Sequence, residues 1–180
     1  LIPIVVAPLV IEIDLKKILT SYSSAVVFLI LGGFIIAQGF ERSKLHQRIA
    51  LGILNRFGNT KINVLISICF LTALLSMIFS NTATCLLMLP IVKSIIDENL
   101  GKKNDSDYSN LLLLAIAYSA SIGGMATPIG TIPNAVVIGF VEENSNIIID
   151  FKSWVFNVFA LVFLFFSVVI VYFFLCIYKL

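Results

Sequence analysis

Charged residues are scarce in this 180-residue chain. Only 12% of the residues are Asp, Glu, Lys or Arg, whereas a soluble domain typically carries about a quarter. Four long tracts contain no Asp, Glu, Lys, Arg or His at all: 21–40, 62–92, 108–141 and 153–178. Each tract can cross, or dip deeply into, a hydrocarbon layer of roughly 30 Å. We therefore predict an all-α integral membrane protein, since a barrel would show alternating segments of about ten residues.

Groups that carry enzymatic or metal chemistry are missing as well. The three cysteines, Cys69, Cys85 and Cys176, lie far apart without metal-binding spacing, and His46 stands alone in a charged loop. No Asp, Glu, His or Lys lies at membrane depth, which argues against a membrane hydrolase, a metalloenzyme or a proton-coupled carrier. No Gly-rich phosphate loop with a Lys is present, so nothing indicates an ATP-driven motor. A net charge of +2 is too small to suggest nucleic-acid binding.

The charges that are present indicate a topology. Basic residues gather in segments 41–61 and 93–107, whereas segment 142–152 is mainly acidic. The positive-inside rule places the two basic segments in the cytoplasm and the acidic segment outside. Within the first basic segment, residues 46–58 mix apolar and basic side chains, which predicts a short amphipathic helix in the cytoplasmic interface.

The tract between the two basic segments contains the polar triplet Ser-Asn-Thr at 80–82. As one helix, residues 62–96 would be about 52 Å long, which exceeds a single span. The tract also begins and ends beside loops that we assign to the same side. We predict a re-entrant hairpin with an inward arm at 63–79, a tip at 80–82 and a returning arm at 83–97. The alternative is two ordinary spans joined by a minimal turn.

A second interruption lies in the sequence GGMATPIGTIPN, residues 123–134, which packs three glycines and two prolines into a charge-free tract. These residues do not continue a helix. We predict a discontinuous transmembrane helix, with two half-helices separated by an unwound linker at 125–134. The alternative is a proline-kinked span without a binding site.

Interrupted helices expose backbone groups that protein or a water-filled cavity must satisfy, so we expect the two breaks to meet in the interior. Carbonyl ends favour a cation, and N–H ends favour an oxyanion. Ser80, Asn81 and Thr82 supply oxygens and donors at the first break, and Ser76 lies one turn earlier on the same face. Asn134 occupies a similar place at the second break. Without a titratable group at this depth, Na⁺ is the expected coupling ion.

Two motifs in this region resemble a known family. SNTATCLLMLPIV and AIAYSASIGGMATPIGTIPNAVV are similar to the N-terminal half of the divalent anion/Na⁺ symporters, the sodium-coupled dicarboxylate and sulfate transporters. The upstream stretch FLILGGFIIAQGFERSKLHQRIAL resembles the third span and interfacial helix of that family. The resemblance runs over nearly the whole chain.

The resemblance implies roles for individual residues. It implies that the substrate is bound by Ser80, Asn81, Thr82 and Thr131. It implies that a first sodium site is formed by Ser76, Ser80, Asn81 and Gly130. It further implies a homodimer in which the site-bearing part moves against a scaffold.

The family also has a second, inverted half with its own Ser-Asn-Thr triplet, so we expect this chain to be one half of an inverted-repeat transporter and a fragment of a longer protein. Residues 1–61 would be scaffold-like, residues 62–152 would form the transport site, and residues 153–180 would be a transmembrane helix. We expect a protein of the plasma membrane that carries a small divalent oxyanion such as a C4 dicarboxylate. The alternatives are a sulfate carrier, an arsenite-type exporter, or a non-coupled channel or structural membrane subunit.

Overall fold

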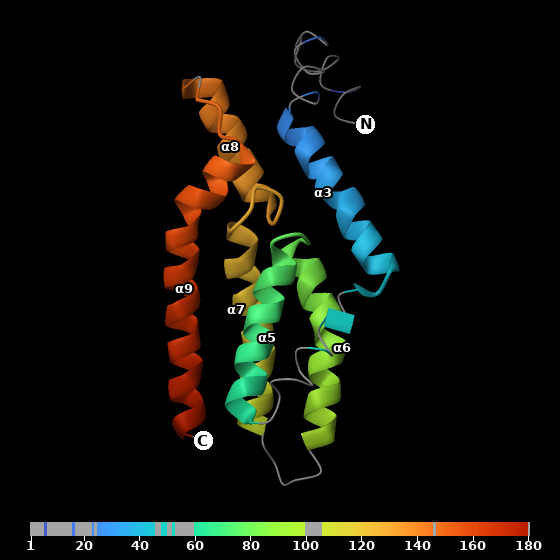
Figure 1. The fold of residues 1–180 in the computed structure, drawn as a ribbon, viewed down its shortest axis with the longest axis vertical. Coiled ribbons are helices and arrows are strands. Elements are labelled where there is room, and N and C mark those ends of the chain that lie inside the picture. The colour runs from blue at the N-terminus through green and yellow to red at the C-terminus, as the bar shows by residue number, and fades with distance from the viewer. Residues whose placement is uncertain are drawn as a thin grey trace.

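A computed structural model describes residues 25–45, 60–99, 106–145 and 147–179, together with positions 6, 16, 23, 48, 49 and 52. The regular elements of these described ranges are all helices (Figure 1). They are α3 (Ala25–Arg42), α5 (Lys61–Ser76), α6 (Asn81–Asn99), α7 (Ser106–Met125), α8 (Ile132–Ser145) and α9 (Phe151–Lys179). The predicted all-α class is confirmed over this part of the chain. The amphipathic helix expected at 46–58 lies largely outside the described residues.

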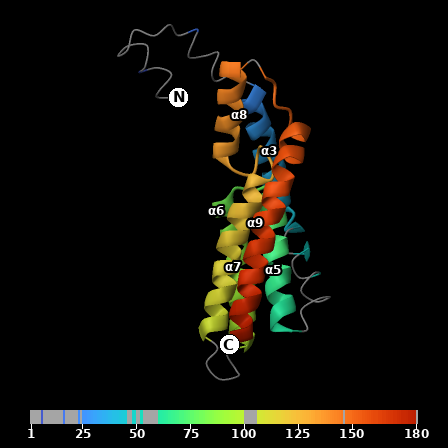
Figure 2. The ribbon, with the colours of Figure 1, turned by 90° about the vertical axis from the view of Figure 1, so that its left-hand side faces the viewer.

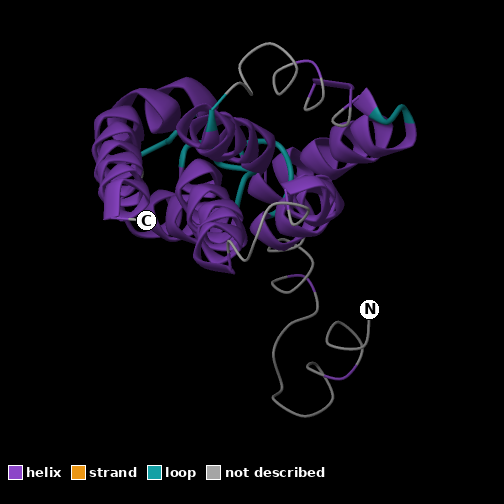
Figure 3. Ribbon diagram, turned by 90° about the horizontal axis from the view of Figure 1, so that it is seen from below, coloured by secondary structure: helices purple, strands orange, loops and turns teal. Residues whose placement is uncertain are grey.

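Helices α5, α6 and α7 pack on one another, and α9 packs on α7 and α5. Figures 1 and 2 show that α5 and α6 form an antiparallel pair whose turn lies half-way along the molecule, against the joint between α7 and α8. Helices α5 and α7 begin, and α6 and α9 end, at the same end of the structure, whereas α8 ends at the other. The view along the helices in Figure 3 shows them arranged side by side around these contacts.

The core of the bundle lies where α5 and α6 meet α7. Its fully buried side chains include Leu65, Ile68, Leu71, Met88, Val92, Leu112 and Phe173. Small residues bring the backbones together, because a Cβ atom on Gly123 would overlap the backbone of Ala73. Between helices surrounded by lipid, such close packing supplies much of the association energy.

Two of the described helices, α7 and α9, are long and apolar enough to cross a membrane, and α5 is a shorter apolar helix. Predicted tract 153–178 corresponds closely to α9. Helix α7 begins at Ser106, two residues before the charge-free tract 108–141.

The turn between α5 and α6 lies earlier than predicted. Helix α5 ends at Ser76, and the N–H groups of Ile78 and Phe79 both donate to the carbonyl of Leu75, at 3.0 and 2.9 Å. Ser80 is the N-cap of α6, because its hydroxyl oxygen accepts the N–H of Ala83 at 3.3 Å. The tip is therefore at 77–80, and the predicted bounds of 80–82 were wrong because Asn81 and Thr82 already belong to the first turn of α6.

The break between α7 and α8 is also shorter than predicted, at 126–131 in place of 125–134. Helix α8 starts at Ile132, with Pro133 in its first turn. A proline is tolerated there because the first N–H groups of a helix have no intrahelical partner. Pro133, one of the residues from which the break was predicted, thus lies in the first turn of the next helix.

Candidate functional site

The turn of the α5–α6 pair brings three oxygen atoms together. The hydroxyl of Ser76, fully buried at the end of α5, lies 2.9 Å from Oδ1 of Asn81 and 2.6 Å from the carbonyl oxygen of Ala120. A serine hydroxyl has one hydrogen and can satisfy only one acceptor fully at a time. The spot is therefore rich in lone pairs and poor in hydrogens, which is the environment that a hard cation prefers.

Two glycines let the break approach this spot. A Cβ atom on Gly124 would overlap Oδ1 of Asn81. A Cβ atom on Gly130 would lie 2.5 Å from the carbonyl oxygen of Gly124 and 2.8 Å from that of Ser76. Any side chain larger than hydrogen is excluded at both positions without a local shift. The structure thus brings Ser76, Asn81 and Gly130 together, as the sequence predicts; what these residues bind remains a prediction.

The other predicted site residues lie around this centre at the surface of the described structure. Ser80 and Thr82 are exposed, whereas Thr131 is half-buried. The first N–H groups of α6 have no partner within the helix, so the helix begins with a partial positive charge beside these hydroxyls. This arrangement can donate hydrogen bonds to an anion without contributing a formal charge.

The side chains of Asn134 on α8 and of Thr127 in the break hold the unwound segment in place. The amide of Asn134 donates to the carbonyl oxygens of Gly124 and Thr127, at 2.9 and 2.8 Å. The hydroxyl of Thr127 donates to the carbonyl oxygen of Met77 in the hairpin turn and accepts the N–H of Gly130, at 3.1 Å for the second bond. Asn134 is therefore a clamp for the broken backbone, and its N–H groups are already used.

Sequence reasoning overlooked Thr127. Its bond to Met77 spans 50 positions of the chain, and no local pattern reports such a partner. The available signal was the presence of a hydroxyl inside a segment that must be unwound, where backbone groups need side-chain partners.

Helix α3 contacts both the break and the hairpin turn. Gly33 packs closely on Ile129 of the break, with a hypothetical Cβ 3.2 Å from the side chain. The ring of Phe40 meets that of Phe79 edge to face, with centroids 6.1 Å apart. An element from the first part of the chain thus contacts both interruptions.

Polar side chains continue one helical turn beneath the site. The hydroxyls of Thr72 on α5 and Thr84 on α6 are fully buried, and no hydrogen-bond partner is found for them within the described ranges. The hydroxyl of Ser119 on α7 is fully buried beside the thiol of Cys69. These three helices pack pairwise on one another, so the helix interface next to the site is closely packed and contains polar groups.

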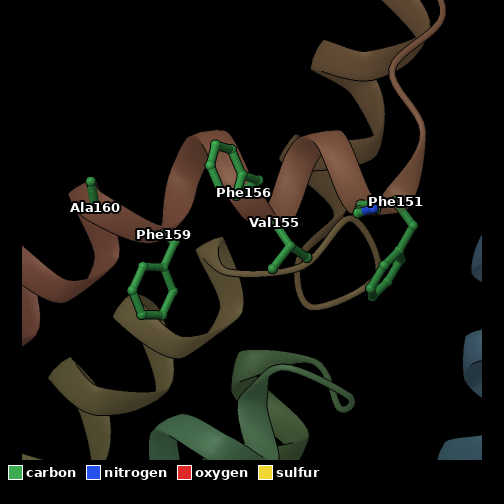
Figure 4. Close-up of a pocket in the computed structure, with 6 residues that line it drawn as sticks. Phe151, Val155, Phe156, Phe159 and Ala160 are labelled. Atoms are coloured by element: carbon green, nitrogen blue, oxygen red, sulfur yellow. The ribbon is translucent and has the colours of Figure 1, made fainter.

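A separate hollow of about 640 Å³ lies along the first half of α9 (Figure 4). It is lined by Phe151, Lys152, Val155, Phe156, Phe159 and Ala160. This lining is apolar apart from one lysine and includes none of the predicted site residues. Among the described lining residues only Lys152 has a polar side chain, so the hollow presents mainly apolar surface.

Comparisons with known proteins agree with the sequence resemblance. A model of the citrate transporter family matches residues 1–180. The sodium-dependent dicarboxylate transporter SdcS of Staphylococcus aureus strain USA300 is 36% identical over 161 residues, which cover 86% of this chain and 31% of that protein. The SdcS proteins of strains NCTC 8325 / PS 47 and COL give the same identity and coverage. The chain therefore spans about a third of the length of these curated relatives.

Proposed function

The chain belongs to the citrate transporter family, and we propose on this premise that it is part of a secondary transporter that carries a divalent oxyanion together with Na⁺. The family is one of transporters and not of enzymes. A C4 dicarboxylate is the proposed anion, in keeping with the name of the SdcS relatives. The observation that carries the proposal is the cluster of Ser76, Asn81 and Ala120 oxygens where two helix ends meet.

We assign Na⁺ to Ser76, Ser80, Asn81 and Gly130. The last carbonyls of α5 give this position a partial negative charge, which favours a cation. Each of these residues can supply a hydroxyl, amide or backbone carbonyl oxygen, and hard cations bind such oxygens. The close approach of Gly130 to the Ser76 carbonyl supports a shared ligand set.

We assign the anion to the start of α6, with Ser80, Asn81, Thr82 and Thr131 as hydrogen-bond donors. The helix N-terminus favours a carboxylate, but no formal positive charge is supplied by these residues. A sodium ion beside them would supply it. Two unit charges about 4 Å apart attract by roughly 4 kcal/mol at an effective dielectric constant of 20. Binding of the cation and of the anion would therefore favour each other, which is the basis of symport.

The fold also supports the predicted organisation. Because α5 and α6 reach only part of the way along α9 (Figure 1), we propose that they form a re-entrant hairpin, with α7 and α8 as a discontinuous span. Residues 62–152 would form the transport-site part, between a scaffold-like segment 1–61 and the spanning helix 153–180. A second, inverted half would complete the site, in a homodimer of the plasma membrane.

Uptake by the full-length protein in proteoliposomes tests this function. We expect labelled succinate to accumulate under an inward sodium gradient, and Asn81→Ala to abolish that accumulation because it removes Oδ1 beside Ser76. Asn157→Ala is a matched control, since the exposed Asn157 amide only bonds to its own helix at Ser153. Uptake at the normal rate without sodium would refute the coupling.

Labelled sulfate and Ser76→Ala separate the related possibilities. Preferential uptake of sulfate would change the proposed anion but keep the class of transporter. A Ser76→Ala protein with undiminished sodium-driven uptake would remove Ser76 from the cation site, because this change deletes the central hydroxyl.

A further inference from the structure

The single tryptophan of the chain, Trp154, makes an unexpected contact with the break. A tryptophan at the start of a span ordinarily anchors the helix at the membrane interface. Here the indole N–H of Trp154, in the first turn of α9, donates to the carbonyl oxygen of Met125 at 3.2 Å. Met125 is the last residue of α7, and its carbonyl lies where the helical hydrogen bonds stop.

This contact completes the support of the carbonyls at the start of the break. Asn134 satisfies Gly124 and Thr127 at 2.9 and 2.8 Å, but its distance to the Met125 oxygen is 3.5 Å. A separation of 3.5 Å is at the outer limit of a hydrogen bond. Trp154 is therefore the better donor for Met125, and the only described donor to these three carbonyls that comes from α9.

The position of the break matters at the scale of tenths of an ångström. Gly130 already packs so tightly on the Gly124 and Ser76 carbonyls that a methyl group would not fit. The Met125 carbonyl is partly buried, and removing the partner of such a group favours a backbone shift that finds another partner. A shift at Met125 would move Gly124 and the following residues relative to the hairpin turn.

We propose that Trp154 is a positioning residue for the cation site: through the Met125 carbonyl, it fixes the unwound segment 126–131 against the turn of the α5–α6 pair. The cation site is the one assigned above, so this inference rests on the proposed function. It links α9, whose Val158 and Val162 pack in the same apolar cluster as Ala126 of the break, to the geometry of the ligand cluster. Trp154 touches neither ion nor substrate and acts only through the backbone.

Trp154→Phe in the full-length protein tests this role, since it keeps an aromatic ring and removes the N–H. We expect the sodium concentration for half-maximal succinate uptake to rise roughly 2- to 10-fold, the range that corresponds to one hydrogen bond. The maximal rate should change little at saturating sodium. Hydrogen–deuterium exchange of the segment 125–131 should become faster, whichever ion or substrate the site binds.

A second variant distinguishes the loss of the indole N–H from a folding defect caused by the smaller ring of phenylalanine. Replacing Trp154 by 3-benzothienylalanine keeps the bicyclic shape and exchanges the N–H for sulfur, so it should reproduce both effects. Phe156→Leu is the control, because Phe156 is 82% exposed on the same helix; it should change neither readout.

The two readouts keep the inference separate from the proposed function. If wild-type uptake needs no sodium, the proposed function fails, while faster exchange of 125–131 would still establish the tether. If exchange and half-saturating sodium are both unchanged when the N–H is removed, the tether does not position the break. Faster exchange with unchanged half-saturating sodium also overturns the proposal, because the segment would then move without affecting the cation site.

Discussion

The two helices long enough to cross a membrane, α7 and α9, differ in burial and in composition. Over half of the apolar window of α7 is buried within the structure, at 56%, against 11% for α9. Helix α7 contains hydroxyls and two adjacent glycines, whereas α9 contains no glycine and consists largely of Phe, Val and Leu. High hydropathy therefore identifies a helix suited to lipid, and small or polar residues within a hydrophobic helix identify the one that packs around a site.

The largest expected effect comes from Gly124 on α7. In Gly124→Ala, the new methyl group would displace the Asn81 side chain from Ser76, while the backbone has room to remain in place because the conflicting atom belongs to a side chain. We expect sodium-driven uptake to fall to background with little change in melting temperature. Gly139→Ala is the control, since nothing lies within 4 Å of a Cβ there. Normal uptake by Gly124→Ala would show that α7 does not shape the site.

The neighbouring glycine should affect the fold more than the site. In Gly123→Ala, the conflicting atoms are the backbone of Ala73, so α5 and α7 must separate. Overpacking of this kind costs about 1–3 kcal/mol. The melting temperature of the purified protein in detergent should fall clearly below that of Gly124→Ala; equal melting temperatures would contradict the assignment of the two glycines to different partners.

The start of α7 offers a smaller test. The buried Tyr108 hydroxyl donates to the carbonyl oxygen of Lys61 at 2.9 Å and so ties the beginnings of α7 and α5 together. Tyr108→Phe keeps the ring and should lower the free energy of unfolding by about 1 kcal/mol. Denaturation of the two proteins in the same detergent measures the difference, and no loss would mean that the bond to Lys61 adds nothing.

The start of α9 should give the smallest effect. The exposed Asp150 caps this helix, with Oδ1 accepting the N–H of Ser153 at 2.9 Å. Hydrogen bonds from the Ser153 side chain and backbone, with Lys152 nearby, lower the pKa of Asp150. Because the pKa is lower in the folded state, the ionised carboxylate stabilises the fold at pH values above the ordinary carboxyl pKa. This contribution is lost as the pH falls through the folded-state pKa. Asp150→Ala should therefore melt at a slightly lower temperature than wild type at pH 7, and this difference should shrink at pH 2; an equal difference at both pH values would exclude the linkage.

The difference between α7 and α9 also explains which parts of the structure could be predicted from the sequence. Tract 153–178 matches α9 because hydropathy alone defines an exposed apolar helix. The hairpin turn and the break were expected from the Ser-Asn-Thr triplet and the glycines and prolines, which act through the local backbone. Their ends were misplaced by a few residues, because the cap by Ser80 and the helix start before Pro133 depend on which donor each backbone group finds.

Contacts between distant positions were beyond sequence reasoning. Thr127 bonds to Met77, and Trp154 to Met125, across 50 and 29 positions. Asn134 was expected to occupy a place at the second break like that of the polar triplet at the first, and the structure shows that its amide N–H groups hold the backbone of the break. Residue type indicated that these side chains need a partner, and only the packing of the helices decides which one.

The atoms around Ser76 are hydroxyl, amide and carbonyl oxygens, and none of these groups gains or loses a proton near neutrality. In the proposed carrier, acidification would therefore leave these oxygen atoms unchanged and alter only the protonation of the transported anion. The pH dependence of transport by such a carrier would follow the fraction of the anion that is fully ionised.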